Sequence, residues 1–142
     1  MPTQVYNKKH IALMQLETAL RLYFERQDYF SVITLAGVAQ EIFGKLLTAR
    51  GIENSLESTK KAVSAIHQHL FGTPLSASQV ADRFNYARNA VKHWSVGQSL
   101  TVELDLVEEA KQKLDNAISD YWLLEAQLTP AMERFQRKIV AA

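Results

Sequence analysis

The sequence predicts an all-α protein: a single domain, residues 1–142, folded as an antiparallel bundle of five or six helices. Five glycines and three prolines leave long stretches of the chain without a helix-breaking residue. Apolar residues recur along these stretches at helical spacing, and no segment alternates convincingly as a β-strand would. The connections between the stretches are short, which favours antiparallel neighbours.

The first two predicted helices run from about Asn7 to Gln27 and from about Tyr29 to Arg50. Asp28 is a candidate N-cap of the second helix, and Gly51 is a stop signal. Their apolar positions are Ile11, Met14, Leu16, Ala19, Leu20, Leu22 and Tyr23 on the first, and Val32, Ile33, Leu35, Ala36, Ala39, Ile42, Phe43 and Leu46 on the second. Because the second helix is apolar over the wider face, we expect it to be the central and most buried one.

Two glycines lie on one edge of this second helix. Gly37 and Gly44 are seven residues apart, with Gln40 between them. A glycine inside a helix costs about 1 kcal/mol relative to alanine. The pair therefore indicates that a neighbouring helix approaches closely along this edge.

Capping boxes, in which a polar N-cap residue is followed three residues later by Glu or Gln, open the next two helices. They are Asn54 with Glu57 and Ser76 with Gln79. The third helix is expected to end at about Leu70, and the fourth to run from about Ser76 to Trp94. The core stripe expected on the fourth helix is Val80, Phe84, Ala87, Val91 and Trp94.

A fifth helix is predicted from about Glu103 to Gln127. Its apolar side carries Leu104, Val107, Leu114, Ile118, Tyr121 and Leu124. Thr129-Pro130 then combines a cap with a proline at the first helical position. This pair either starts a short last helix or kinks the fifth one.

The most informative stretch is residues 88–93, Arg-Asn-Ala-Val-Lys-His, near the end of the fourth helix. An Arg followed by His at this distance is common by chance, but an Asn directly after the Arg lowers the chance to about 2% on this composition. On a helical wheel Asn89, Lys92 and His93 point away from the core stripe, and Arg88 lies at its shoulder. The alternative interpretation is a solvated polar face, with Arg88 an ordinary surface cation.

Together these groups suit chemistry on a phosphodiester. An imidazole exchanges protons near neutral pH, so His93 can act as general base or acid. The planar guanidinium of Arg88 suits a phosphate and its transition state, and Asn89 can orient the imidazole. The set fits metal-independent attack of an RNA 2′-hydroxyl on its own phosphate. A two-fold dimer would supply both the acid and the base.

Glu41 is the candidate supporting residue outside the stretch. It is expected to pair with Lys45 at i,i+4 on the surface. Alternatively, Gln40 or Glu41 contacts Arg88 and orients its guanidinium. Lys92 is a second supporting candidate, as a further cation on the same face.

Composition limits the classes of function. The net charge is +1 and no long run of like charges occurs, so non-specific coating of DNA is not expected. The chain has no cysteine, which excludes disulfides and thiolate metal sites. His67 and His69 point apart on a helix, so we expect no metal site, and no cofactor motif is present. The apolar run Phe30–Leu47 is interrupted by Gln40, Glu41 and Lys45, and the first residues do not resemble a signal peptide. We therefore expect a cytoplasmic protein that does not span a membrane.

Arg88, Asn89 and His93 resemble the motif of the HEPN superfamily (higher eukaryotes and prokaryotes nucleotide-binding), in which Arg, then a polar residue, precedes His by four to six positions. Residues 35–47 also look like the second helix of uncharacterised bacterial proteins of this type. The resemblance implies an antiparallel bundle, a homodimer and a composite site in an interface cleft. In active relatives His and Arg support RNA cleavage without a metal.

The function expected is a metal-independent endoribonuclease, of a kind found in toxin–antitoxin or defence pairs. His93 would be general base or acid, Arg88 the phosphate clamp and Asn89 the orienting group. RNA or a nucleotide, an antitoxin protein and a second copy of the chain are the candidate partners. The alternative is a non-catalytic helical dimer that binds a nucleotide or a protein partner through the same face.

Overall fold

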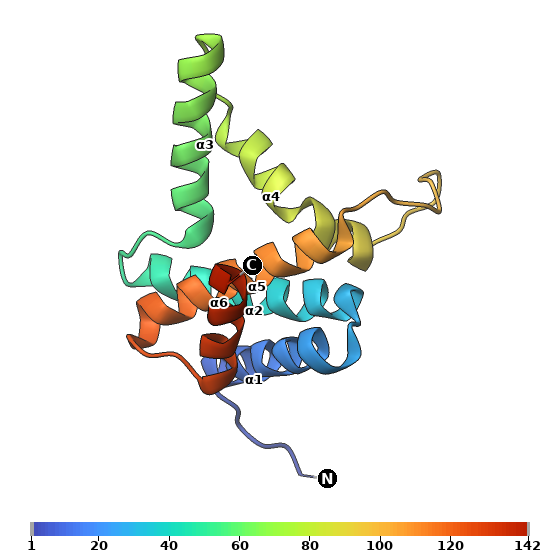
Figure 1. The fold of residues 1–142 in the computed structure, drawn as a ribbon, viewed down its shortest axis with the longest axis vertical. Coiled ribbons are helices and arrows are strands. Elements are labelled where there is room, and N and C mark those ends of the chain that lie inside the picture. The colour runs from blue at the N-terminus through green and yellow to red at the C-terminus, as the bar shows by residue number, and fades with distance from the viewer. Residues whose placement is uncertain (1, 142) are drawn as a thin grey trace.

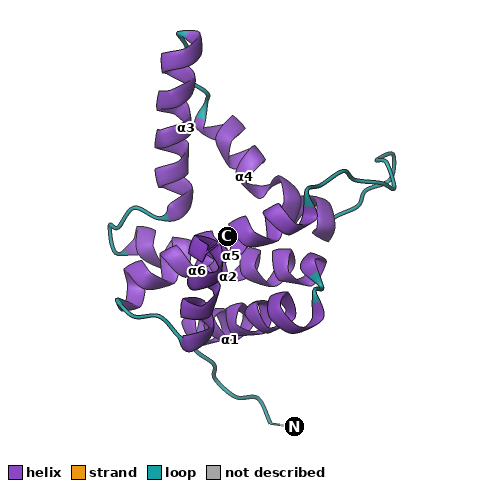
Figure 2. Cartoon of the chain, viewed as in Figure 1, coloured by secondary structure: helices purple, strands orange, loops and turns teal. Residues whose placement is uncertain are grey.

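The computed structural model describes residues 2–141, which form helices and no strand (Figures 1 and 2). The α-helices are α1 (Lys8–Arg21), α2 (Tyr29–Ala49), α3 (Ser55–Phe71), α4 (Ala77–Lys92), α5 (Leu106–Glu125) and α6 (Pro130–Ala141). A π-helical turn, η1 (Leu22–Arg26), continues α1. The all-α prediction is confirmed, and the sixth helix is separate from the fifth rather than a kinked continuation of it.

The core lies around α2, which packs most extensively on α5 and then on α1. Figure 1 shows α1 and α2 side by side and α5 alongside α2, with α6 in front of them. The fully buried side chains of α2 are Val32, Ile33, Ala36, Ala39, Phe43 and Leu47. By length and hydropathy alone α2 would also pass as a membrane span, but half of it is buried against the other helices. The prediction that this helix is central is confirmed.

The predicted caps account for where the helices begin. Asp28 accepts a hydrogen bond from the Ser31 backbone N–H at 3.2 Å. Ser76 and Gln79 form the reciprocal capping box. The box predicted at Asn54 is only half formed, because Asn54 accepts from the Glu57 N–H while the Glu57 carboxylate binds Lys60 instead.

Helices α3 and α4 leave the core as a hairpin, which we call the arm (residues 55–92; Figure 1). Every residue of α3 is described, and none of them is buried. The base of the arm is held by Asp120 of α5, which accepts from the Ser55 N–H at 2.7 Å and the Ser55 hydroxyl at 2.8 Å. Asn54 adds a hydrogen bond to the carbonyl of Gly44 at 3.0 Å. The arm is therefore fixed at its base, while its far end extends away from the core.

The fourth helix ends earlier than predicted. Lys92 is its last residue, and His93 is the C-cap with an extended backbone (φ −124°, ψ 141°). Trp94 is 55% exposed and does not belong to the core stripe, so that prediction was wrong. A helical wheel does not apply beyond the cap, where a turn at Ser95–Gln98 leads the chain away. In the rest of the stripe Val80 and Ala87 are buried, and Phe84 and Val91 are half-buried.

Candidate functional site

Arg88 lies against α2, over Gly37. A Cβ atom placed on Gly37 would come within 2.7 Å of Cδ and 2.9 Å of Cγ of Arg88. At Gly44 the nearest atom to such a Cβ is Nδ2 of Asn54, at 3.2 Å. The close approach predicted from the glycine pair is confirmed. The side chains that fill the space come from α4 and from the N-cap of α3.

The guanidinium of Arg88 is held by Glu41. Its NH1 donates to Glu41 Oε2 at 3.0 Å, and the Arg88 side chain is only 15% exposed. The other oxygen, Glu41 Oε1, accepts from Lys45 Nζ at 3.0 Å. The two alternatives for Glu41, surface pairing and orientation of Arg88, are thus observed together.

The charges around Glu41 favour its ionised form. The hydrogen bond from Lys45 lowers the pKa of Glu41, partial burial opposes this, and the charges of Arg88, Lys45 and Lys92 lower the pKa further. One carboxylate is therefore surrounded by three cations. The cluster fixes the end of α4 on α2 and leaves a local excess of positive charge.

Asn89, Lys92 and His93 lie in an open groove of about 750 Å³ between α4 and the loop that follows it. The groove is lined by Asp82, Tyr86, Asn89, Ala90, Val91, Lys92, His93, Trp94, Gln98, Ser99, Leu100, Thr101 and Val102. Among the described residues Arg88 is not part of this lining. The structure thus brings Asn89, Lys92 and His93 together, whereas Arg88 faces α2.

Lys113 of α5 is a buried lysine near Arg88 that sequence reasoning missed. Its side chain is 2% exposed, donates to the backbone carbonyl of Phe84 and lies with Nζ 4.1 Å from the centroid of that ring. Burial lowers the pKa of Lys113 to about 8, the nearby charge of Arg88 lowers it too, and Glu109 opposes this. The sequence signal was a lysine at a position of the apolar stripe of α5, beside Leu114.

Gln40 and Asp120 form a second buried polar contact that the sequence did not reveal. Both side chains are buried, at 4% and 0% exposure, and the Gln40 side chain lies close enough to Asp120 to lower its pKa. Burial raises the pKa of Asp120, although the hydrogen bonds from Ser55 and Gln40 counteract the effect. Gln40 thus has a structural role at the base of the arm and does not contact the groove.

Comparisons with protein-family models, with curated proteins and with solved structures find no match to this chain. Within residues 2–141 no group of three His, Cys, Asp or Glu side chains is placed to hold a metal ion. The site is therefore judged on its own geometry.

That geometry suits a nucleotide chain. Lys92 and His93 offer a cation and an imidazole beside each other, and Tyr86 and Trp94 expose aromatic rings at 53% and 55%. Cations contact phosphates and aromatic faces stack on bases, which is how proteins hold single-stranded nucleic acids. The hydroxyls of the loop, at Ser99 and Thr101, add neutral hydrogen-bonding groups.

Proposed function

We propose that this chain is a cytoplasmic, HEPN-like endoribonuclease that works without a metal and as a homodimer, of the kind found in toxin–antitoxin or defence pairs. The observation that supports this is the position of Asn89, Lys92 and His93 in one open groove. The groove is wide enough for a nucleotide, and all three side chains reach it from the last turn of α4 and its C-cap.

In the proposed reaction His93 accepts the proton of the RNA 2′-hydroxyl. The 2′-oxygen then attacks its own phosphorus, the bond to the 5′-oxygen breaks, and the leaving 5′-oxygen takes a proton from water. The products carry a 2′,3′-cyclic phosphate and a 5′-hydroxyl, and His93 releases its proton to solvent before the next turnover. Lys92 contacts the phosphate and stabilises the added charge of the transition state. Asn89 orients the imidazole or binds a phosphate oxygen.

Arg88 is assigned a positioning role within one chain. Its guanidinium is bound by Glu41 on the side of α4 that faces α2. By fixing the last turn of α4, Arg88 sets the direction in which Lys92 and His93 project. Its effect on catalysis is therefore indirect, and Arg88→Lys should restore part of what Arg88→Ala loses.

A second candidate function is binding without cleavage, of a nucleotide or a protein partner. The observation that favours it is the same contact of Arg88 with Glu41, because it leaves the groove with one fixed cation on α4, Lys92. Both functions need the groove, and only the first needs His93 as a proton carrier.

An RNA cleavage assay in EDTA separates the two. We expect the wild type to cut single-stranded RNA, and His93→Ala to lose about 10²-fold or more in rate, the usual contribution of general acid–base catalysis. His69→Ala is the matched control, since His69 is an exposed histidine of α3 far along the chain from the groove. RNA that is bound but never cut would favour nucleotide binding without cleavage. RNA that is neither bound nor cut would contradict both cleavage and RNA binding by the groove, and would leave only the protein partner.

A further inference from the structure

Helix α3 carries an apolar stripe that its own chain covers only in part: its first three positions are half-buried and its last two are exposed. Leu56, Thr59, Val63, Ile66 and Leu70 follow one another at alternating intervals of three and four residues. We call these five positions the α3 seam. Exposure is high at its far end, with Ile66 at 59% and Leu70 at 65%. Alternating three- and four-residue spacing is the pattern by which one helix packs against another.

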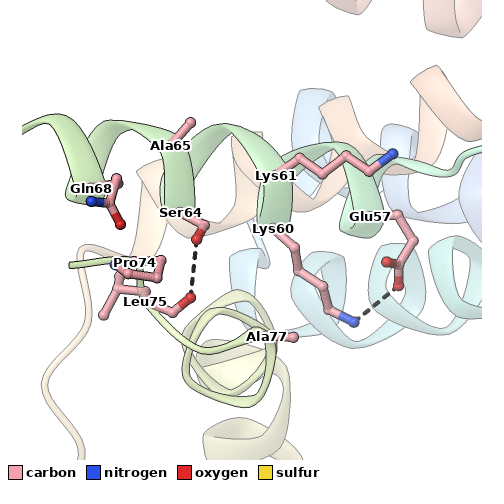
Figure 3. A pocket seen from close by; sticks show the side chains of 9 residues that line it. All are labelled: Glu57, Lys60, Lys61, Ser64, Ala65, Gln68, Pro74, Leu75 and Ala77. Carbon is pink, nitrogen blue, oxygen red and sulfur yellow. Dashed lines mark hydrogen bonds and ion pairs between the residues drawn. The ribbon is translucent and has the colours of Figure 1, made fainter.

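The exposed end of the seam, Ile66 and Leu70, lies outside the pocket between α3 and α4. The α3 side of this shallow pocket is lined by Glu57, Lys60, Ser64 and Gln68, and Pro74 and Leu75 line its other side (Figure 3). The Ser64 hydroxyl donates to the Leu75 carbonyl at 3.1 Å, and Gln68 closes the turn with a bond to the Gly72 carbonyl at 2.8 Å. The arm is thus a preformed hairpin, and no seam residue is among those that line its pocket.

The charges on the arm are compatible with a second copy of itself. No Asp, Glu, Lys or Arg occurs from residue 62 to residue 81, so two arms side by side bring no like charges together there. Nearer the base, Lys60 binds Glu57 at 2.9 Å, and Lys61 binds Glu53. Like charges across an interface would oppose pairing, and here they are absent or neutralised.

From the seam and this charge distribution we infer that two copies of the chain pair through α3, antiparallel and about a two-fold axis. In this register Val63 faces Ile66 of the second copy, and Thr59 faces Leu70, and each contact occurs twice. The arms cover each other, and the groove at the other end of α4 stays open in both copies. The homodimer would then contain two separate cleavage sites rather than one composite site. This consequence rests on the proposed function, whereas the pairing through α3 does not.

The first test is the mass of the protein in solution. We expect the wild type to sediment at twice 16.1 kDa, and Ile66→Glu to sediment at 16.1 kDa with an unchanged circular dichroism spectrum. Met14→Glu is the matched control, because Met14 of α1 is 58% exposed, against 59% for Ile66, and should leave the dimer intact. A monomeric wild type, or a dimer that Ile66→Glu leaves unchanged, would overturn the inference.

The second test is the direction of pairing, which the absence of cysteines makes simple. A mixture of Val63→Cys and Ile66→Cys chains should form a disulfide dimer on oxidation. Leu70→Cys alone should not, because the two copies of position 70 would be more than about 15 Å apart along the paired helices. A disulfide between two Leu70→Cys chains would show parallel pairing and contradict the antiparallel register.

These results are independent of RNA cleavage. A dimer that dissociates on Ile66→Glu, in a protein that cuts no RNA, would support the seam and contradict the ribonuclease. If the dimer contains two separate sites, monomeric Ile66→Glu keeps its cleavage rate per chain within about two-fold, although the wild type is a homodimer. A composite site would lose its activity on dissociation.

Discussion

The contact between Gly37 and Arg88 gives the sharpest prediction at the scale of single residues. Gly37→Ala should lower the free energy of unfolding by about 1–2 kcal/mol, because the new Cβ displaces Arg88 from α2. In an Arg88→Ala background the same change should raise the free energy of unfolding by about 1 kcal/mol, since alanine is the better helix former. Denaturant titration of the four proteins measures both values. An effect of the same sign in both backgrounds would contradict the contact.

Lys113 predicts how stability depends on pH. Its folded pKa of about 8 lies below the ordinary value of 10.5, so between these values the unfolded chain binds more protons than the folded one. Stability from this group therefore rises with pH, by about 1.5 kcal/mol from about pH 8 to 9.5. Burial raises the pKa of Tyr23 and Tyr121, so at still higher pH these tyrosines ionise more readily in the unfolded chain. Their ionisation lowers the stability as pH rises and ends the range in which Lys113 raises it.

Thermal or denaturant unfolding across this range measures the rise. Lys113→Met should abolish it, because no proton is then released on folding. Lys111→Met, on the same helix and less buried, should retain it. Parallel pH profiles for the wild type and Lys113→Met would show that Lys113 keeps its proton in the folded state.

At the scale of elements, the arm depends on one carboxylate at its base. Asp120→Ala leaves the Ser55 N–H without its partner and should lower the free energy of unfolding by about 1–3 kcal/mol. It should also speed amide hydrogen exchange in the first turn of α3 more than in α2. Asp115→Ala, a change to a surface aspartate of the same helix, should do neither. Equal exchange in the two variants would mean that Asp120 does not hold the arm.

The ends of the helices show what the sequence could and could not predict. The beginnings of α2 and α4 were well predicted, because Asp28 and Ser76 cap through bonds to backbone groups three residues away, which are local in sequence. The beginning of α5 was not, since it was expected at about Glu103 and lies at Leu106, after the cap Asp105. The end of α4 was missed, because no glycine or proline directly follows His93 to mark the end of the helix. The π-helical turn η1, which continues α1, was also missed, since a π-turn has no residue pattern of its own.

At the scale of the whole molecule, the central position of α2 followed from its wide apolar face, but the groove did not. Whether Arg88 lies in the groove with Asn89 and His93 depends on which side of α4 packs on α2. The contacts of Arg88 with Gly37 and Glu41, which are distant in sequence, place it against α2 instead. The charge of Arg88 lowers the pKa of Lys113 because α4 lies near α5 where Lys113 binds the Phe84 carbonyl. Such contacts arise from tertiary packing, which local pattern does not specify.

The cleavage mechanism is the central claim, and RNA with one 2′-deoxy nucleotide tests it most directly. In EDTA, wild-type protein should cut the all-ribose RNA to leave a 2′,3′-cyclic phosphate, and should fail to cut after the deoxy position while cutting elsewhere. His93→Ala should cut neither the all-ribose RNA nor the RNA with the deoxy nucleotide. His69→Ala should cut both RNAs at the same positions as the wild type. Cleavage after the deoxy nucleotide, or by His93→Ala at the wild-type rate, would contradict a 2′-hydroxyl attack assisted by His93.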